Sequence, residues 1–437
     1  MDVRPTHRRV APLAHRRKSA PAPQFAAGNG LIDRRLLLAV AAGGAAGLAG
    51  QPATAAGELA VEPWMQEYGS PFVGYGQPSK FEAKVARTFA SAPGTNGTGA
   101  ARTPLHLLDG TITPNGLHFE RSHSGIPDID PDRHRLLIHG LVKRPLVFGL
   151  QALDRYPMES RIAFLECGGN SGTLYQKDPA QLNAQALHGL VSCAEWTGIR
   201  LTTLLDEAGI DPKGQWLLAE GADAAGMSRS VPIAKAMDDG MIALYQNGER
   251  LRPSNGYPVR LLLPGWEGNM QVKWLRRIKI TEGPTMTKDE TSKYTISLPG
   301  DKALQFVFPI EGNSIITGPS PGLTLREPGF YEISGLAWSG YGRITRVDVS
   351  ADGGKSWATA ALQEPVLPKA LTRFRIPWRW QGGPAILQSR ATDDSGYVQP
   401  TRAELIAERG TARTIYHFNG IASWAVAENG EIRHVYA

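Results

Sequence analysis

The chain has 437 residues, 42% of them hydrophobic, which is enough for two domains because single hydrophobic cores rarely grow beyond about 250–300 residues. Charged residues make up 20%, which excludes a disordered polyelectrolyte. The 49 glycines and 32 prolines favour a turn-rich, strand-rich fold. The first 55 residues hold eight of the 47 basic residues and two of the 41 acidic ones, so the rest of the chain is neutral. The net charge of +6 therefore gives no support to nucleic-acid binding.

The first 55 residues have the pattern of an export signal. The pair Arg34 and Arg35 precedes a weakly apolar run at 36–50, and Ala-Thr-Ala at 53–55 is a small-residue cleavage pattern. Paired arginines are typical of twin-arginine signals, although Asp33 stands where serine or threonine is usual. The apolar run is shorter than the roughly 20 residues that span a bilayer, so an uncleaved anchor is the less favoured alternative.

The sequence predicts four segments in chain order. A twin-arginine-type export signal covers 1–55, which places the mature protein, starting near Ala56, in the periplasm without a membrane span. An extended arm rich in proline and glycine covers 56–100, a mixed α/β domain covers 101–300, and a second domain with a C-terminal tail covers 301–437.

The mixed domain is expected to contain strands at 135–140, 161–165 and 259–263, where short apolar runs are bounded by turn residues. Short helices are expected at 202–208, with Thr202 as the N-cap, and at 232–237. The polar segment 285–297 is predicted to be a loop.

The second domain is expected to be an antiparallel β-sandwich at about 305–415. Alternating segments at 330–335, 345–350 and 386–391 are separated by turn signals such as Asp352-Gly353-Gly354. Aromatic residues in the final segment are expected to pack back onto the body of the protein: Tyr416, Phe418, Trp424 and Tyr436.

Cys167 is a candidate metal ligand. It follows the strand expected at 161–165 and precedes two glycines, which allow a bulky group to approach the backbone closely. A thiolate suits a soft or redox-active metal. Two alternatives remain open from the residues alone: a buried structural cysteine, or a disulfide with Cys193.

Two further clusters could bind an anion. Arg121 and His123 alternate in an extended segment, although a solvated loop has the same pattern. Glycine-bearing loops lie near Arg260 and Lys273 and could bind a phosphate, although an ordinary hairpin with surface cations is the alternative.

Together these segments resemble the sulfite oxidase family. The matching stretches occur in the family's order over roughly residues 100–437: Phe119–His123, Glu166–Asn170, Glu195–Leu201, Asn255–Arg260, Val272–Leu275, Ala337–Gly340 and Arg346–Gly354. The resemblance implies an α+β protein, in which a mixed α/β molybdopterin-binding domain is followed by an Ig-like β-sandwich that forms a dimer. Within the family, the resemblance is to the molybdenum subunits of sulfane dehydrogenases.

The resemblance also implies a molybdenum–molybdopterin cofactor with Cys167 as the metal ligand. Arg121, Cys167 and Tyr294 are the implied catalytic residues; Arg121 faces the substrate anion and Tyr294 lies in the active site. The implied cofactor-binding residues are Phe119, Glu120, Arg121, Ser122, His123, Cys167, Asp223, Asn255, Arg260, Gln271, Val272 and Lys273. The implied reaction is oxo transfer to a sulfur atom.

Two departures from the family bear on the substrate. Ser171 and Gly172 stand where sulfite-oxidising relatives carry arginine, and Asn255 stands in place of a histidine. Fewer cations weaken the binding of free sulfite and leave room for a larger group. We therefore expect oxidation of carrier-bound sulfane sulfur during thiosulfate oxidation. The alternatives are a sulfite dehydrogenase, an enzyme of the same fold that reduces its substrate, and a non-catalytic binding module.

The implied oxidation releases electrons, so a partner that accepts them is expected. The sequence has no haem-attachment motif, flavin fingerprint or iron–sulfur cysteine pattern. We expect a separate c-type cytochrome subunit, a sulfur-carrier protein as substrate donor, and a homodimer through the second domain, which gives a two-plus-two assembly. Cys193 is expected to be a buried free thiol.

Overall fold

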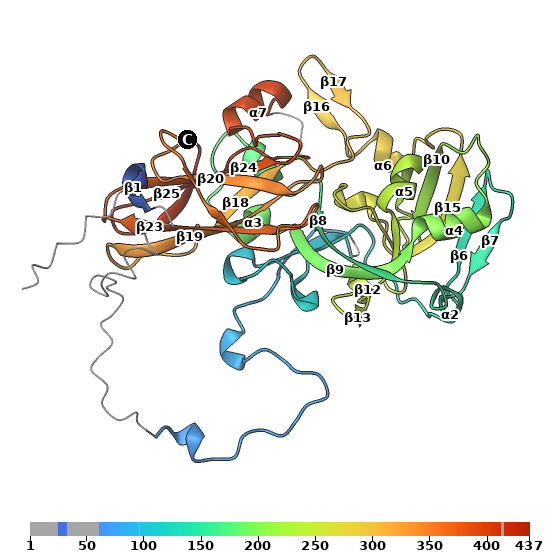
Figure 1. Ribbon diagram of the computed structural model, residues 1–437, viewed down its shortest axis with the longest axis horizontal. Coiled ribbons are helices and arrows are strands. Elements are labelled where there is room, and N and C mark those ends of the chain that lie inside the picture. The colour runs from blue at the N-terminus through green and yellow to red at the C-terminus, as the bar shows by residue number, and fades with distance from the viewer. Residues whose placement is uncertain (1–24, 33–60, 96, 412–414) are drawn as a thin grey trace, which may run out of the picture.

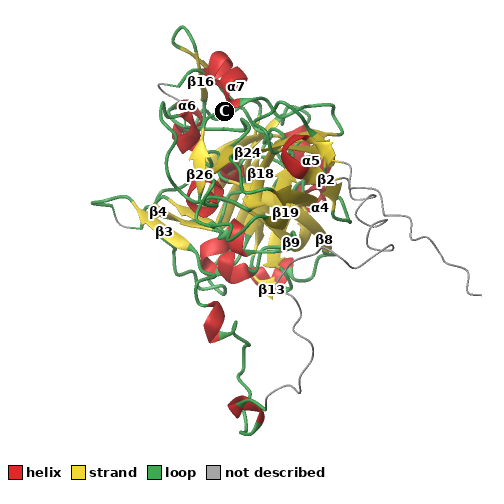
Figure 2. Ribbon diagram, turned by 90° about the vertical axis from the view of Figure 1, so that its left-hand side faces the viewer, coloured by secondary structure: helices red, strands yellow, loops and turns green. Residues whose placement is uncertain are grey.

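The computed structural model describes residues 25–32, 61–95, 97–411 and 415–437. Two bodies lie side by side along the long axis (Figure 1), and strands dominate over helices in the molecule (Figure 2). This arrangement confirms the expected fold class, a mixed α/β domain followed by a β-sandwich.

Three sheets build the first body. One sheet has the order β11-β10-β15-β6-β7, a second has the order β13-β12-β9-β8 with β14 beside β12, and a third has the order β3-β4-β5. Their strands are β3 Thr88–Ser91, β4 Gly99–Arg102, β5 Glu120–Ser122, β6 Leu136–Gly140, β7 Leu146–Phe148, β8 Glu159–Glu166, β9 Val191–Arg200, β10 Trp216–Gly221, β11 Ser228–Pro232, β12 Met241–Gln246, β13 Glu249–Arg250, β14 Arg260–Leu262 and β15 Leu275–Thr281. The strands predicted at 135–140, 161–165 and 259–263 correspond to β6, β8 and β14.

Short helices pack on these sheets: α2 Leu150–Leu153, α3 Ala184–His188, α4 Leu201–Ala208, α5 Ile233–Asp239 and α6 Lys288–Thr291. The predicted N-cap Thr202 is wrong, because α4 begins at Leu201 with Arg200 as its N-cap. The amide of Leu201 instead donates to the carbonyl of Gly240 at 2.8 Å, so a backbone carbonyl satisfies this helix end and no capping side chain is required.

The segment 285–297, predicted as a loop, contains α6 and the start of a strand. Thr287 and Glu290 form a reciprocal capping box at the start of α6. This threonine-x-x-glutamate spacing is a helix-start signal in the sequence, and it holds the chain in register just before Tyr294.

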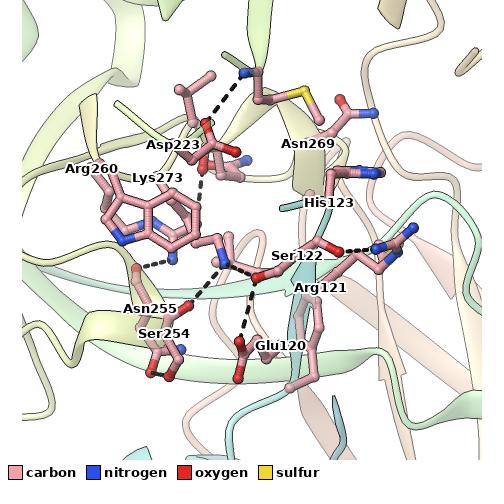
Figure 3. Close-up of a pocket in the computed structure, with 18 of the residues that line it drawn as sticks. Glu120, Arg121, Ser122, His123, Asp223, Ser254, Asn255, Arg260, Asn269 and Lys273 are labelled. Atoms are coloured by element: carbon pink, nitrogen blue, oxygen red, sulfur yellow. Dashed lines mark hydrogen bonds between the residues drawn. The ribbon is translucent and has the colours of Figure 1, made fainter. Parts of the chain in front are cut away.

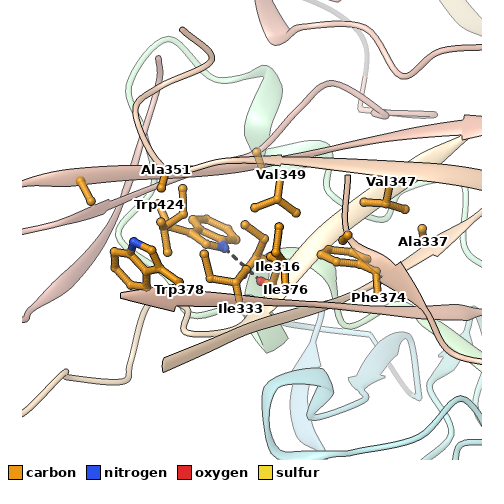
Figure 4. Packing of buried hydrophobic residues seen from close by; sticks show 14 of the residues in the cluster. Ile316, Ile333, Ala337, Val347, Val349, Ala351, Phe374, Ile376, Trp378 and Trp424 are labelled. Carbon is orange, nitrogen blue, oxygen red and sulfur yellow. Dashed lines mark hydrogen bonds between the residues drawn. The ribbon is translucent and has the colours of Figure 1, made fainter. Parts of the chain in front are cut away.

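The second body is a sandwich of two sheets. One sheet contains β1 Phe25–Ala27, β2 Leu31–Ile32, β18 Asn313–Gly318, β19 Gly329–Trp338, β22 Ala361–Leu362 and β23 Thr372–Trp380. The other contains β20 Ile344–Ser350, β21 Ala358–Thr359, β24 Ala385–Asp393, β25 Ser423–Val426 and β26 Ile432–Val435. Inward-facing residues such as Ile333, Val349 and Phe374 fill the space between the sheets (Figure 4).

The sandwich continues beyond the predicted limit of about 415, because β25 and β26 extend the second sheet. The final aromatic residues pack on the body as expected: Phe418 meets Tyr175 with ring centroids 5.0 Å apart, and Tyr416 meets Tyr294 at 5.1 Å. The remaining elements are α7 Arg402–Arg409 and the hairpin of β16 Ile296–Leu298 with β17 Lys302–Leu304.

A shared hydrophobic cluster joins the two bodies. It includes Phe164 and Cys193 from the first and Ile315, Trp338 and Leu371 from the second. Cys193 is completely buried, and both cysteines are free, as expected for Cys193. Burial raises the pKa of the Cys193 thiol to about 12, so this side chain behaves as an uncharged packing residue.

The predicted arm is partly correct. Residues 61–87 form an arm with two short 3-10 helices, Pro63–Met65 and Lys80–Glu82 (Figure 1). The hydroxyl group of Tyr75 in this arm donates to Glu249 of the first body, and β3, which begins at Thr88, belongs to a sheet. The paired arginines, the apolar run 36–50 and the expected cleavage site lie outside the described residues. No helix among the described residues is long and apolar enough to cross a membrane.

Candidate functional site

A pocket opens in the first body, and every residue that the sequence predicted for the site lines it. Arg260 and Lys273 lie on one side of this pocket, and Arg121 and His123 on the other (Figure 3). The lining residues come from β5, from the turn after β8, and from the loops around β14. Segments about 170 residues apart in the chain are thus brought together.

The turn that carries Cys167 is fixed from both sides. Cys167 directly follows β8, as predicted. Glu166 accepts hydrogen bonds from Asn170 Nδ2 at 2.8 Å and from Trp338 Nε1 of the sandwich at 2.6 Å. A Cβ on Gly168 would lie 1.9 Å from Glu267 Oε1, so only glycine allows this close approach.

Cys167 could be the single protein ligand of a metal held mainly by a bound cofactor. No group of three or more His, Cys, Asp or Glu residues in the described part of the chain could hold a metal alone. Burial raises the pKa of the Cys167 thiol, while the amide of Gly169 and the positive charge of Arg121 oppose this effect. A soft metal would stabilise the thiolate at this position.

Lys273 and Arg260 form the strongly basic side of the pocket. Lys273 Nζ donates to the carbonyl of Ser254 at 2.9 Å, and Arg260 donates to the carbonyls of Asn255 at 2.8 Å and Gln271 at 3.0 Å. Within the described residues, neither cation forms an ion pair, and Arg260 Nε has no hydrogen-bond partner. The alternative of an ordinary hairpin with surface cations is therefore wrong.

Burial disfavours the charged form of both of these side chains. It lowers the pKa of Lys273 to about 7 and that of Arg260 to about 9. A bound phosphate would reverse this effect, because an opposite charge within a few ångströms favours the protonated form. The donors therefore fit the phosphate of a pterin cofactor.

The opposite side of the pocket is built on β5 and the segment after α6. The Nη1 group of Arg121 donates to the carbonyl of Gly99 at 3.1 Å, which holds the guanidinium in place. Tyr294 shares a hydrogen bond of 3.1 Å with His123 Nε2. The guanidinium of Arg229 lies over the Tyr294 ring, 5.3 Å from its centroid, and forms a cation–π contact with it.

The remaining predicted residues complete the walls in different ways. Asp223 Oδ2 accepts from Ser124 at 3.1 Å, and Asn255 lies within 3.4 Å of His118 Nδ1. The side chain of Gln271 donates to the carbonyl of Leu263 at 2.6 Å, so it braces the neighbouring loop. The other wall residues from the prediction are Phe119, Glu120, Ser122 and Val272.

Sequence reasoning missed several lining residues. His118 immediately precedes the predicted motif; burial lowers its pKa to about 3, so it is neutral, and its Nε2 atom has no partner. A buried, unpaired imidazole nitrogen suits a polar heterocycle such as a pterin. The other missed lining residues are Leu165, Met227, Ser254, Gly268, Asn269 and Trp274.

The expectation that Ser171 and Gly172 leave room in the pocket is wrong, because neither lines it. Ser171 is buried and shares a 2.7 Å hydrogen bond with His188. A Cβ on Gly172 would lie 2.5 Å from the carbonyl oxygen of Ile415. The C-terminal segment therefore packs against this turn.

Fold and pocket together define a class of protein. Residues 123–305 match the family described as "Oxidoreductase molybdopterin binding domain", and residues 305–423 match "Mo-co oxidoreductase dimerisation domain". The first domain is thus a molybdopterin-binding oxidoreductase domain, and its cofactor is molybdenum–molybdopterin.

Similar proteins narrow this class. Sulfite oxidase of Gallus gallus is 31% identical over 347 residues, which cover 72% of this chain and 74% of that protein. Mitochondrial sulfite oxidase of Drosophila melanogaster is 31% identical over 350 residues, and the match spans only 60% of its length. The chain belongs to the sulfite oxidase family of molybdenum oxidoreductases.

A solved structure shares both domains with this chain. The sulfane dehydrogenase SoxCD from Paracoccus pantotrophus superimposes with a TM-score of 0.83 at 46% identity. The match covers 86% of this chain and 97% of that chain.

Proposed function

We propose that this chain is the molybdenum subunit of a sulfane dehydrogenase that oxidises carrier-bound sulfane sulfur. The observation that carries the proposal is the low positive charge beside Cys167. Among the residues that line the pocket, Arg121 is the cation whose charge acts on Cys167, whereas burial lowers the pKa of His123 and raises that of Tyr294, which keeps both neutral near pH 7. Arg102 also interacts with Cys167 but does not line the pocket. A lining with one cation at this place suits the end of a sulfur chain better than free sulfite, a compact dianion.

The chain's own residues bind and orient the substrate. Arg121 holds the anionic end of the sulfur chain by charge-assisted hydrogen bonds. Tyr294, fixed between His123 and Arg229, offers its hydroxyl group to an oxygen that gains charge during the reaction. When bound, the cofactor supplies oxygen-atom transfer and accepts two electrons.

The assembly that we propose contains three kinds of partner. The second domain belongs to a dimerisation family, which supports a homodimer. The similarity to a protein named SoxCD supports a second subunit, which we propose to be a c-type cytochrome that receives the electrons. A sulfur-carrier protein delivers the substrate, and the assembly works in the periplasm.

A sulfite dehydrogenase is the second candidate, because several similar proteins are named sulfite oxidase. The test compares the purified cytochrome-containing complex on thiosulfate-loaded carrier protein and on free sulfite, with the same electron acceptor and ionic strength. We expect kcat/KM for the carrier-bound sulfane to exceed that for sulfite by at least about tenfold, the size of one lost charge-assisted bond. A higher kcat/KM for sulfite would make the second candidate correct.

A further inference from the structure

Residues 25–32 complete the edge of the sandwich, although the sequence places them in the export signal. Strand β2 pairs with β23 antiparallel, with Leu31 opposite Trp378. Figure 1 shows β1 against the sandwich, at the end of the molecule away from the first body. The segment thus adds a strand to a sheet edge, which is a common mode of peptide recognition.

Specific contacts hold this segment in place. Trp378 Nε1 donates to the carbonyl of Asn29 at 2.7 Å, and Asn29 Nδ2 donates to the carbonyl of Ala351 at 2.8 Å. The amide of Gly28 donates to Ser356 Oγ at 2.7 Å. Both sheets of the sandwich therefore contact the segment.

Buried side chains and the backbone conformation of the segment restrict which residues fit at these positions. Leu31 is 0% exposed and Ile32 is 2% exposed, and Leu31 belongs to the sandwich core. Gly30 has a φ of 92°, and a Cβ there would lie 2.1 Å from the carbonyl oxygen of Arg379. A larger residue at this position would push the strand off the edge.

We propose that the folded sandwich carries a binding site for residues 25–32, which holds the export signal against the protein before export. Arg34, the first of the paired arginines, lies two residues after Ile32. The bound segment thus ends two residues before that motif in the sequence. Cleavage near Ala56 separates the segment from the mature chain and opens the edge of β23. The proposal does not rest on the redox function.

Hydrogen exchange of the full-length precursor, followed by mass spectrometry, tests the proposal. We expect slow exchange in 29–32 and in the end of β23, and at least about tenfold faster exchange in both after Leu31→Asp. Phe25→Asp is the matched control, because this side chain is 48% exposed and should leave exchange unchanged. Slow exchange in β19 and β24 shows that each variant is folded, and Gly30→Ala replaces Leu31→Asp if that variant does not fold.

Three outcomes would overturn the proposal. Exchange in 29–32 at the rate of an unfolded peptide in the wild-type precursor means that no site is formed. Equal exchange in wild type and Leu31→Asp means that the contact is not specific. Protection that disappears on dilution means that a second copy of the chain supplies the segment.

Discussion

The sandwich core and the pocket differ in the kinds of side chain that they bury. In the sandwich, apolar side chains fill the space between the sheets, and the buried indole of Trp424 donates from Nε1 to the carbonyl of Ile316 at 3.0 Å (Figure 4). In the pocket, Lys273 and Arg260 have no carboxylate partner among the described residues, and His118 Nε2 is unpaired. The sandwich core is thus built mainly from apolar side chains, whereas the buried cations and the unpaired imidazole of the pocket indicate that a ligand completes it.

The largest expected effect separates the two cysteines. Cys167→Ser should lower turnover by at least about 100-fold, because a hard hydroxyl group cannot replace a soft thiolate as a metal ligand. Cys193→Ala, in the cluster between the domains, is the control and should keep its turnover. Steady-state rates per folded chain check both, and near-normal turnover of Cys167→Ser would refute the assigned ligand.

Loss of packing in the sandwich should lower the stability of the protein without changing its cofactor content. Phe374 is completely buried, so Phe374→Ala should lower the free energy of unfolding by about 3–5 kcal/mol through the lost contacts and the cavity. Chemical denaturation measures this loss. Molybdenum content per folded chain should stay unchanged, and a matching loss of molybdenum would show that the two regions are coupled.

Tyr294→Phe removes only a hydroxyl group at the substrate side of the pocket. We expect kcat/KM to fall about tenfold, or about 1.4 kcal/mol, with unchanged molybdenum content. Tyr331→Phe is the control, because its hydroxyl group donates to the carbonyl of Glu327 in the sandwich. Loss of cofactor from Tyr294→Phe would instead indicate a structural role for this hydroxyl group.

The last expected effect is a pH dependence of the cofactor-free protein. The folded pKa of Lys273 is about 7, whereas an unfolded lysine has a pKa of about 10.4. Between these values the unfolded chain binds more protons, so the free energy of unfolding rises with pH. Denaturation at pH 7 and 9 should show a rise of roughly 1–2 kcal/mol in the wild type relative to Lys273→Met. An equal pH slope in both proteins would contradict the cost assigned to this buried cation.

Local patterns in the sequence predicted several strands and helices of the first domain, whereas most of the candidate site residues were expected only from the resemblance to the sulfite oxidase family. The position of Cys167 after a buried strand and two glycines follows from its neighbours alone, and the structure places it there. The role of Gln271 could not be predicted, because its side chain braces a loop whose shape depends on distant contacts. The start of α4 was missed for the same reason, since its first amide bonds to Gly240 across a gap in the sequence.

The second domain shows a similar limit. Strands β25 and β26 are short, and they join the sheet because β25 pairs with β24 and β26 pairs with β25. Residues 25–32 show this most clearly, because their partner Trp378 lies about 350 residues away along the chain. Such contacts depend on tertiary structure and leave little periodic signal in the sequence.

The central claim, that a molybdenum–pterin cofactor completes the pocket, has one direct test. Metal analysis and hydrogen exchange are compared for the freshly purified chain and for the same chain after cofactor removal. We predict about one molybdenum per chain, and at least about tenfold faster exchange in 119–123 and 271–274 after removal, with unchanged exchange in β19 and β23. A fresh chain without molybdenum, or pocket segments that exchange equally slowly in both states, would contradict the account.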